Sequence, residues 1–236
     1  MQEETMSTKV LSVGGSIVAP EFPDVDFVKR FVEMAKNYLA AHKGDRLILV
    51  VGGGGPARIY QNAFKDVTAT AADSGTEAAD WIGIMATRLN AQFVKACFGD
   101  LCREPVVTDP TVAKDFTGSV LVAAGWKPGF STDNDAVLLA EKFDADTVVN
   151  LSNIEKVYTD DPRKNPDAKP LDEISWADFR KMVGDEWVPG KNCPFDPIAS
   201  KKAQEMGLTV ICAGGKNIAN TQAILEGNAY IGTTIR

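Results

Sequence analysis

The sequence predicts an α/β fold with a mainly parallel sheet, and three features of the chain support this prediction. Short apolar runs typical of strands alternate with segments of helical periodicity from one end of the chain to the other. The run RLILVV, residues Arg46–Val51, is apolar after its first residue, as expected for a parallel strand covered on both faces. Three apolar runs end in glycine-rich loops, and each loop is followed by a helix.

The N-terminal part of the chain contributes the first two strand–loop–helix units. Residues 9–13 are predicted to form a short apolar strand that ends at Gly14-Gly15-Ser16. Pro23-Asp24 marks the entry to a helix. Apolar residues recur at helical spacing along it, at Phe27, Phe31, Met34, Ala35 and Tyr38. After Arg46–Val51, the glycines 52–55 lead into a second helix that contains ARIYQNAF.

The middle of the chain continues the series. The small and polar residues 68–76 (TATAADSGT) predict a loop, and Asp80 is expected to open a long helix. One apolar stripe of this helix is broad enough to cover the sheet and a partner subunit as well. The stripe consists of Trp81, Ile84, Met85, Leu89, Phe93 and Ala96. Residues 103–107 and 120–124 are predicted to be strands, and the second strand leads into the loop 125–129.

The C-terminal part begins with a predicted helix at 133–143 and a buried strand at 147–151. The charged, proline-rich segment 163–175 is expected at the surface. Asp196 is a typical N-cap followed by Pro197 at the first helical position, so a helix is expected to begin there. The other predicted elements are a helix near 176–183, a strand at 208–212, a helix at 218–225 and a strand at 230–235.

Composition excludes several classes of protein. The chain has 236 residues, 44% of them apolar, which is enough to bury a real core in one large or two small domains. Its net charge of -7 argues against non-specific nucleic-acid binding, which needs a basic face. The acidic N-terminus lacks the apolar core of a signal peptide, and no run approaches the length of a membrane span. We therefore expect a cytoplasmic protein.

Cysteine and histidine usage argues against a metal centre built by the protein. The four cysteines form no C-x-x-C pair, and His42 is the single histidine. We therefore predict no metal-ligating residues. The cysteines (Cys97, Cys102, Cys193 and Cys212) are expected to be reduced thiols, some of them buried as small apolar residues.

The glycine-rich loops indicate phosphate handling. Glycine lets the backbone approach a ligand closely, so that amide groups before a helix can face phosphate oxygens. A single such loop is more often a tight turn, but three of them in one α/β chain favour a phosphate ligand. None of the three matches G-x-x-x-x-G-K-[ST] or a spaced G-x-G-x-x-G, so P-loop and Rossmann sites are not expected. The loops near 125–132 and 152–162 follow consecutive strands, and we expect one to hold a phosphate acceptor and the other a nucleotide donor.

Several side chains near these loops have both a structural and a functional interpretation. Arg58 falls one turn into the helix after the second loop, where its guanidinium can reach a phosphate or simply lie in solvent. Asp80 is either an ordinary N-cap or a ligand for sugar hydroxyls. Asp133 and Asp196 lie at predicted helix starts, where they can cap the helix, orient catalytic groups or attract Mg²⁺ through water. Tyr158 either packs in a hairpin or stacks on a base.

Seven segments in unbroken order then identify a family. They are VLSVGGSIVAPEFPDVDFV, LILVVGGGGPARIY, DWIGIMATRLNA, GWKPGFSTD, SNIEKVYTDDP, FDPIASKKA and a closing IGTTI. Together they resemble the amino-acid-kinase superfamily, and within it the uridylate (UMP) kinases of archaeal type. The resemblance spans nearly the whole chain and implies a three-layer αβα sandwich with a central, mainly parallel sheet. It further implies one continuous domain, with an acceptor lobe at residues 1–145 and an ATP-binding lobe at 146–236.

The resemblance also implies roles for individual residues. The acceptor UMP is expected at Gly53, Asp80, Trp126, Lys127, Pro128, Gly129, Phe130, Ser131 and Thr132. ATP is expected at Gly14, Gly15, Ser16, Gly54, Arg58, Ser152, Asn153, Tyr158 and Asp161. The implied catalytic residues are Asp133, Asp196 and Arg58. The family further implies Mg²⁺ held mainly through phosphates and water, in-line transfer without a covalent intermediate, and a homo-oligomer, a dimer or a hexamer.

The sequence departs from the family pattern at a few positions. Ser12 stands where many members have a lysine, and Lys156 replaces a turn glycine. The serine-rich segment before Asp196-Pro197 reads GKNC at 190–193. Trp126 and Lys127 replace a small residue and a polar one in the acceptor loop. Lys156 or Lys191 can restore the missing positive charge, or the donor site is altered.

These observations predict an ATP:UMP phosphotransferase that produces UDP and ADP from nucleotide substrates. Two alternatives stay open on the sequence. The first is a non-catalytic nucleotide-binding or storage protein on the same fold, similar to the molybdenum-storage proteins, which the departures at Ser12 and Lys156 favour. The second is a kinase of another small acceptor such as carbamate or a carboxylate. Arg58, Asp80 and the GWKPGFSTD loop favour the nucleotide acceptor over both.

Overall fold

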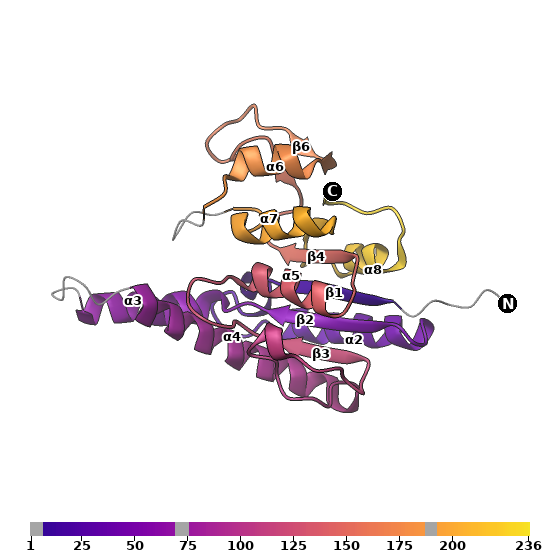
Figure 1. Ribbon diagram of the computed structural model, residues 1–236. Helices are drawn as coiled ribbons and strands as arrows, with labels where there is room; N and C mark the ends of the chain where they lie inside the picture. Colours follow the sequence, from indigo (N-terminus) through magenta and orange to yellow (C-terminus); the bar gives the residue numbers. More distant parts are fainter. Residues whose placement is uncertain (1–6, 69–75, 187–192) are drawn as a thin grey trace.

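The computed structural model describes residues 7–68, 76–186 and 193–236. Within them a seven-stranded sheet runs through the molecule in the order β3-β2-β1-β4-β8-β9-β7 (Figure 1). Its strands are β1 (Thr8–Val13), β2 (Arg46–Val51), β3 (Val120–Ala123), β4 (Thr147–Ser152), β7 (Glu173–Ile174), β8 (Thr209–Gly214) and β9 (Thr233–Ile235). A separate antiparallel pair is formed by β5 (Val157–Tyr158) and β6 (Pro170–Leu171).

The sheet is mainly parallel, which confirms the predicted fold class. Strand β1 is an interior strand and pairs in parallel with β2 on one side and β4 on the other. Val10 lies opposite both Ile48 and Val148 in these two pairings. The pairs β2–β3, β4–β8 and β7–β9 are parallel too, and β8–β9 is antiparallel.

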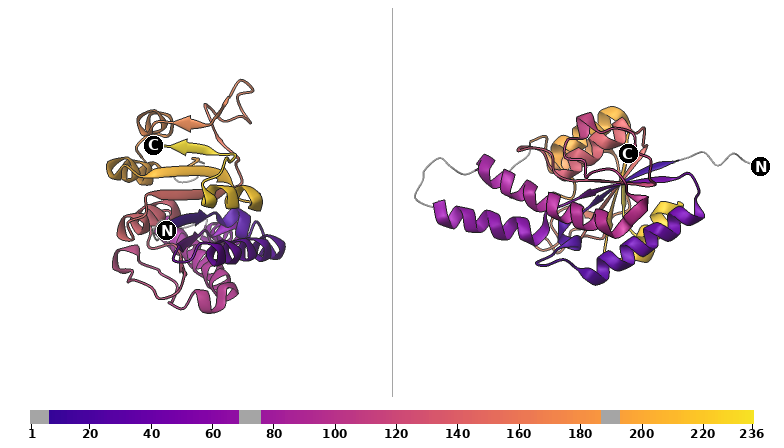
Figure 2. Two further views of the ribbon diagram at one scale, coloured as in Figure 1. Left: turned by 90° about the vertical axis from the view of Figure 1, so that its right-hand side faces the viewer. Right: turned by 90° about the horizontal axis from the view of Figure 1, so that it is seen from below.

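Helices cover both faces of the sheet, so the fold has three layers (Figure 2). The helices are α1 (Gly15–Val18), α2 (Val25–Ala41), α3 (Gly54–Thr68), α4 (Thr76–Phe98), α5 (Thr132–Lys142), α6 (Trp176–Val183), α7 (Pro197–Met206) and α8 (Ile218–Glu226). One core joins α2, α4 and α8 to side chains such as Leu11 and Leu49, and the other joins α5, α6 and α7 to Val10 and Ile48. The alternation of inward-facing residues along each strand therefore feeds two cores, as a doubly covered sheet requires.

Local capping explains where several helices begin. The Asp24 carboxylate accepts a hydrogen bond from the Phe27 amide at 3.0 Å and starts α2. The Asp196 carboxylate accepts from the Ala199 amide at 2.8 Å, with Pro197 as the first residue of α7. Both match the sequence prediction. In α5 the N-cap is Ser131, one residue before the predicted Thr132-Asp133 start.

Three sequence predictions about elements were wrong. Residues 103–107 do not form a strand, and only Val107 makes an isolated parallel bridge, to Ala123. Pro105 has no amide proton and so cannot take part in a ladder of hydrogen bonds. Helix α4 begins at Thr76 rather than at Asp80, and β9 covers only Thr233–Ile235 of the predicted 230–235. The predicted loop 68–76 lies mostly outside the described residues.

Helices α3 and α4 pack against each other along their lengths and extend together beyond the ends of the strands (Figures 1 and 2). The apolar stripe predicted on α4 divides between two environments. Ile84 is buried, whereas Trp81, Met85 and Leu89 are 40%, 57% and 68% exposed. The helix therefore covers the sheet with one side and presents an apolar row to the outside with another. In the described part of the chain, α4 and the other helices are too short or too polar to cross a membrane.

Candidate active site

The predicted site residues gather at the carboxyl ends of the central parallel strands. Gly14 follows β1, Gly52 follows β2, the loop from Gly125 follows β3, and β4 ends at Ser152. Chain connections diverge to opposite sides of β1, because β2 and β4 flank it. Open α/β sheets bind ligands outside the carboxyl ends of their strands at such a point of divergence. The topology thus brings together loops that are far apart in sequence.

The first two glycine loops are packed against each other so closely that side chains do not fit. A Cβ atom on Gly15 would lie 2.0 Å from the Gly54 amide nitrogen. One on Gly54 would lie 2.2 Å from the Ala19 carbonyl oxygen, and Gly54 has a positive φ of 64°. These contacts place the first amides of α1 and α3 side by side at the strand ends. Amides at helix starts lack partners within the helix and are suited to anions.

A buried asparagine that sequence reasoning missed holds the second loop in place. The Asn90 side-chain amide in α4 donates to the carbonyls of Gly52 at 2.9 Å and Gly53 at 3.0 Å. Asn90 is 4% exposed. Its only sequence signal is an amide residue within an otherwise apolar stretch of a helix, which does not reveal its partner.

Two of the predicted catalytic residues, Asp133 and Asp196, meet near the carboxyl ends of the central strands. One Asp133 carboxylate oxygen accepts from the Ser12 hydroxyl at 3.0 Å, and the other accepts from the Asp196 amide at 3.3 Å. Burial raises the pKa of Asp133 to about 6, and the negative charge of Asp196 adds to the rise, while the Ser12 hydrogen bond opposes it. Ser12, the residue that departs from the family pattern in the first strand, therefore contacts Asp133 directly.

A second buried carboxylate on α5 was not predicted from the sequence. Asp135 is 0% exposed, and one of its oxygens accepts from the Trp126 amide at 3.2 Å. Its other oxygen, Oδ1, has no hydrogen-bond partner among the residues that the structure describes. Burial raises the pKa of Asp135 to about 7; the Trp126 amide lowers it, and the charges of Asp133, Asp109 and Asp196 raise it further.

The third glycine loop, expected to hold the acceptor, is anchored mainly by α4. The Gly125 amide donates to the Thr87 hydroxyl at 2.8 Å. The Arg88 guanidinium donates to the carbonyls of Gly125 at 3.4 Å and Trp126 at 3.0 Å. Asp80, which the sequence places at the acceptor, accepts from the Gly129 amide at 3.3 Å. The structure therefore brings Asp80 and this loop together across 49 residues of sequence.

The side chains of this loop form an aromatic cluster around a cation. The Lys127 ammonium lies 3.9 Å from the centroid of the Trp126 ring and 4.9 Å from that of Phe130. The two rings are 4.8 Å apart. Cation–π attraction thus holds the Lys127 ammonium against the rings of Trp126 and Phe130.

The residues expected at the donor lie at the end of β4 and in the segment after it. The Ser152 hydroxyl accepts from the Ile154 amide at 3.3 Å, Asn153 is exposed, and Tyr158 is half-buried in β5. Asp161 is engaged by its neighbour, because both of its oxygens accept from the Arg163 guanidinium at 3.0 Å. Arg163 accordingly holds the pKa of Asp161 below its ordinary value.

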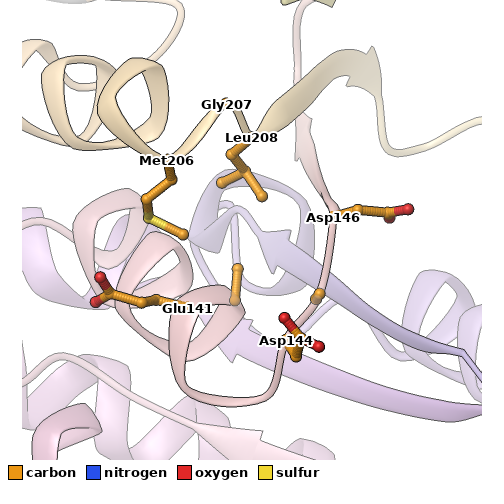
Figure 3. A pocket seen from close by; sticks show the side chains of 8 residues that line it. Glu141, Asp144, Asp146, Met206, Gly207 and Leu208 are labelled. Carbon is orange, nitrogen blue, oxygen red and sulfur yellow. The ribbon is translucent and has the colours of Figure 1, made fainter.

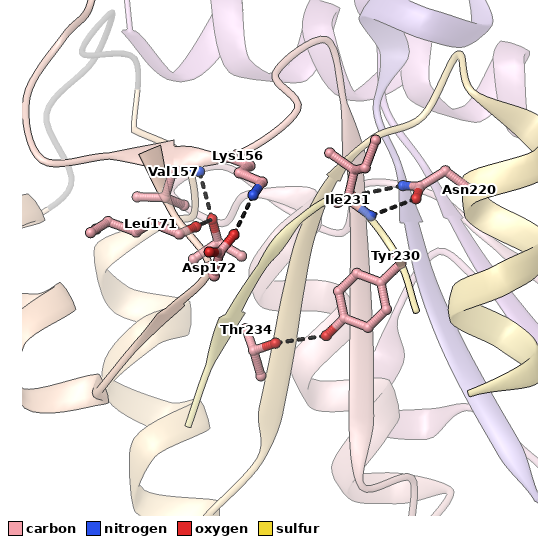
Figure 4. A network of polar contacts seen from close by, with 9 residues as sticks. Lys156, Val157, Leu171, Asp172, Asn220, Tyr230, Ile231 and Thr234 are labelled. Atoms are coloured by element: carbon pink, nitrogen blue, oxygen red, sulfur yellow. Dashed lines mark hydrogen bonds and ion pairs between the residues drawn. The ribbon is translucent and has the colours of Figure 1, made fainter. Parts of the chain in front are cut away.

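Lys156 is turned toward an edge of the fold. Its ammonium pairs with the Asp172 carboxylate (Figure 4). The following amide, of Val157, donates to the Thr233 hydroxyl at 2.8 Å, and that hydroxyl also bonds the Leu171 carbonyl. Lys156 therefore ties the turn after β4 to Asp172, between β6 and β7, and Val157 ties it to β9. The other lysine considered as a replacement, Lys191, lies outside the described residues.

Arg58 is the most exposed of the predicted catalytic residues. It lies in α3 and makes one long hydrogen bond, of 3.5 Å, to the Pro20 carbonyl. Pro20 also lies next to Gly55, where an added Cβ would meet the Pro20 carbonyl oxygen at 2.1 Å. The guanidinium thus lies beside the two packed glycine loops with most of its donors unused by the protein groups described.

A pocket of about 360 Å³ lies at the opposite end of the sheet and is separate from these loops (Figure 3). Asp146 and Leu208, which line it, precede β4 and β8. Glu141 and Asp144 add further carboxylates. This acidic lining is unsuited to phosphate, so the pocket is not a nucleotide site.

Comparisons with family models and with known proteins identify relatives of this chain. The family model for the amino acid kinase family matches residues 7–214. The chain belongs to the amino acid kinase family. A family member from Methanospirillum hungatei, named uridylate kinase, is 35% identical over 98% of this chain and 95% of its own length. Another uridylate kinase, from Pyrococcus abyssi, is 33% identical over 96% of this chain and 98% of its own.

Solved structures of the family share the fold. The crystal structure of uridylate kinase from Archaeoglobus fulgidus matches with a TM-score of 0.80 at 28% identity, over 97% of this chain and 99% of that one. The UMP kinase from Bacillus anthracis matches with a TM-score of 0.75 at 16% identity, over 98% and 96% of the two chains. The αβα architecture expected from the resemblance is thereby confirmed.

Proposed function

We propose that this chain transfers the γ-phosphoryl group of ATP to UMP and releases UDP and ADP. The observation that carries the proposal is the similarity to proteins named uridylate kinase over almost the full length of both chains. The site geometry supports it, because two packed glycine loops lie beside the half-buried Asp133. Phosphoryl transfer requires alignment and charge neutralisation more than covalent chemistry.

The acceptor UMP is assigned to the lobe formed by residues 1–145. Asp80 and the loop after β3 face each other there through the Asp80–Gly129 hydrogen bond, and both are suited to a nucleotide. Arg58 is assigned to the phosphates. The full acceptor set is Gly53, Asp80, Trp126, Lys127, Pro128, Gly129, Phe130, Ser131 and Thr132.

ATP is assigned to the loops after β1 and β2 and to the lobe formed by residues 146–236. Gly14, Gly15, Ser16 and Gly54 are placed along the transferring phosphates, because the positive ends of helix dipoles favour anions. The adenine nucleotide is assigned to Ser152, Asn153, Tyr158 and Asp161.

Mg²⁺ would neutralise phosphate charge when the nucleotide is bound. The ion prefers phosphate oxygens and water, and the protein needs to contribute only nearby negative charge. Asp133 and Asp196 supply that charge at the strand ends, so the residues present fit such an ion. Asp133 and Asp196 are assigned the task of organising the reaction centre. No strong base is required, because the phosphate of UMP is already a nucleophile.

We also propose that the chain assembles into a homo-oligomer through α4, with a dimer as the basic unit and a hexamer as the family arrangement. Trp81, Met85 and Leu89 lie one turn apart on one face of α4 and are largely exposed. An apolar row of this length on a helix is suited to a symmetric contact with a second copy.

The test is a coupled assay that follows ADP release from Mg-ATP. The acceptors are UMP, CMP, AMP, carbamate and acetate, each at the same concentration. We expect turnover with UMP well above the rate with the small acids. Turnover with a small acid alone would replace UMP as the acceptor. If ADP appears with none of the acceptors, the chain is a binding or storage protein on this fold.

A further inference from the structure

One residue of the acceptor loop, Trp126, is held by side chains at both its backbone amide and its backbone carbonyl. Its amide donates to Asp135 at 3.2 Å, and its carbonyl accepts from Arg88 at 3.0 Å. Both peptide groups of Trp126 that face the neighbouring helices are therefore held by side chains, one by a carboxylate and one by a guanidinium.

The partners approach from opposite sides of the loop. Arg88 belongs to α4, and Asp135 belongs to α5, so the Trp126 peptide groups are held between two helices that cover different faces of the sheet. The same turns of α4 carry Thr87, which bonds Gly125, and Asn90, which bonds the second glycine loop. A shift of α4 would therefore move both loops together.

Asp135 is an unfavourable residue for its position unless it has a task. It is fully buried, and its Oδ1 has no partner in the described part of the chain. A carboxylate in such a place costs free energy, and an apolar side chain of similar volume would pack there without this cost. What Asp135 does contribute is one acceptor for the Trp126 amide.

We propose that Arg88 and Asp135 are positioning residues that hold the acceptor loop in its binding conformation through the backbone of Trp126. This inference rests on the proposed function only in naming the loop's ligand as the acceptor nucleotide. Neither residue touches the reacting atoms. Their effect passes through Trp126 to Gly129 and thus to Asp80, which bonds the same loop from α4.

The experiment compares substitutions that remove each contact with conservative ones that keep it. Asp135→Val matches the side-chain volume and removes the acceptor, whereas Asp135→Asn keeps an oxygen for the Trp126 amide. Arg88→Met removes the donors, and Arg88→Lys keeps one. We expect Asp135→Val and Arg88→Met to raise KM for UMP about tenfold, the value of one hydrogen bond to a charged group, with KM for ATP within about twofold. The conservative variants should recover most of the loss.

Arg46→Met is the matched control. Arg46 also pairs with a carboxylate, that of Asp115, and stacks on an aromatic ring, with 3.6 Å from its guanidinium carbon to the Phe116 centroid. It lies at the start of β2, at the opposite end of the sheet from the loops. We expect the control to leave both KM values unchanged. Equal changes in both KM values in the Arg88 and Asp135 variants would show a general structural role and overturn the proposal.

Hydrogen exchange separates this proposal from the proposed function. In Asp135→Val and Arg88→Met, amides of residues 125–131 should exchange at least about tenfold faster than in the wild type, while amides of β3 keep their protection. This measurement needs no turnover, so it tests the clamp even if the wild-type protein fails to phosphorylate UMP. Unchanged exchange at 125–131 in both variants would overturn the proposal.

Discussion

At the scale of single residues, the site contains two carboxyl groups that are shielded from solvent. Asp133 and Asp135 are two residues apart on α5, and burial raises the pKa of both, to about 6 and about 7. Their partners differ. Asp133 bonds Ser12 and the Asp196 amide at the strand ends, whereas Asp135 bonds the acceptor loop. The first is therefore assigned to the reaction centre and the second to loop position.

Asp133→Asn should depress kcat at least about tenfold and leave the fold intact. The carboxamide keeps one acceptor for Ser12, but its nitrogen cannot accept from the Asp196 amide and carries no charge toward the phosphates. Steady-state kinetics and circular dichroism check this. Asp146→Asn, at the amino end of β4, is the control and should leave kcat unchanged. Wild-type kcat in Asp133→Asn would reduce Asp133 to a structural role.

Asp135 should also make stability depend on pH. Its pKa is about 7 in the folded protein and near 3.8 in the unfolded chain, so folding takes up a proton between these values. The stability that the neutral carboxyl contributes to the folded protein is fully present below about pH 4 and is lost as pH rises to about 7. The expected slope is about 1.4 kcal/mol per pH unit near the middle of this window. Urea unfolding of the nucleotide-free protein from pH 5 to 8 measures it.

Asp135→Asn provides the comparison for that slope. The variant lacks the titrating group, so the free energy of unfolding should fall less steeply with pH than in the wild type. At pH 8 the variant should be more stable, because the wild-type protein buries a charge there. Parallel curves for the two proteins would mean that Asp135 does not titrate in this window.

At the scale of elements, the packed loops after β1 and β2 behave as one unit. Gly15→Ala should destabilise the protein by about 3 kcal/mol or more. The added Cβ would lie 2.0 Å from the Gly54 nitrogen, and its nearest neighbours are all backbone atoms, which cannot move aside as a flexible side chain can. Gly99→Ala is the control. Gly99 has a φ of 58° and open space around its Cβ position, so that change should cost only about 1 kcal/mol. Equal losses in thermal unfolding would contradict the packing argument.

Helix α4 is the element that connects the loops. Thr87, Arg88 and Asn90 hold two of the three glycine loops from neighbouring positions. The same helix carries the exposed row of Trp81, Met85 and Leu89, and the Arg88 guanidinium carbon lies 5.8 Å from the centroid of the Trp81 ring. A second copy of the chain that contacts this row would therefore contact the same helix that positions the acceptor loop.

At the scale of the whole molecule, the exposed row on α4 predicts the effect of surface charges on assembly. The double change Met85→Glu and Leu89→Glu should convert the oligomer to monomer, because two charges would be buried in the contact. Sedimentation equilibrium measures the mass. Val112→Glu, at another exposed apolar residue, is the control and should keep the oligomer. A wild-type protein that sediments as a monomer would remove the proposed interface.

Much of the architecture follows from local signals. Asp196-Pro197 begins α7 as predicted, and Trp176–Val183 forms the helix expected there, because caps and helical periodicity act over a few residues. One strand prediction overlooked a local signal. Residues 103–107 end in two valines, yet only Val107 is paired, and Pro105 cannot donate to a ladder of hydrogen bonds.

The sequence by itself determined the alternation of strands and helices, the three glycine loops at strand ends, and the family with its set of candidate residues. Only the tertiary structure showed that Ser12 meets Asp133 across 121 residues and that Arg88 reaches Trp126 across 38. The reason is physical. Caps and periodicity depend on neighbours along the chain, whereas the partner of a buried polar group depends on which strands lie side by side, and the order of strands around β1 decides that.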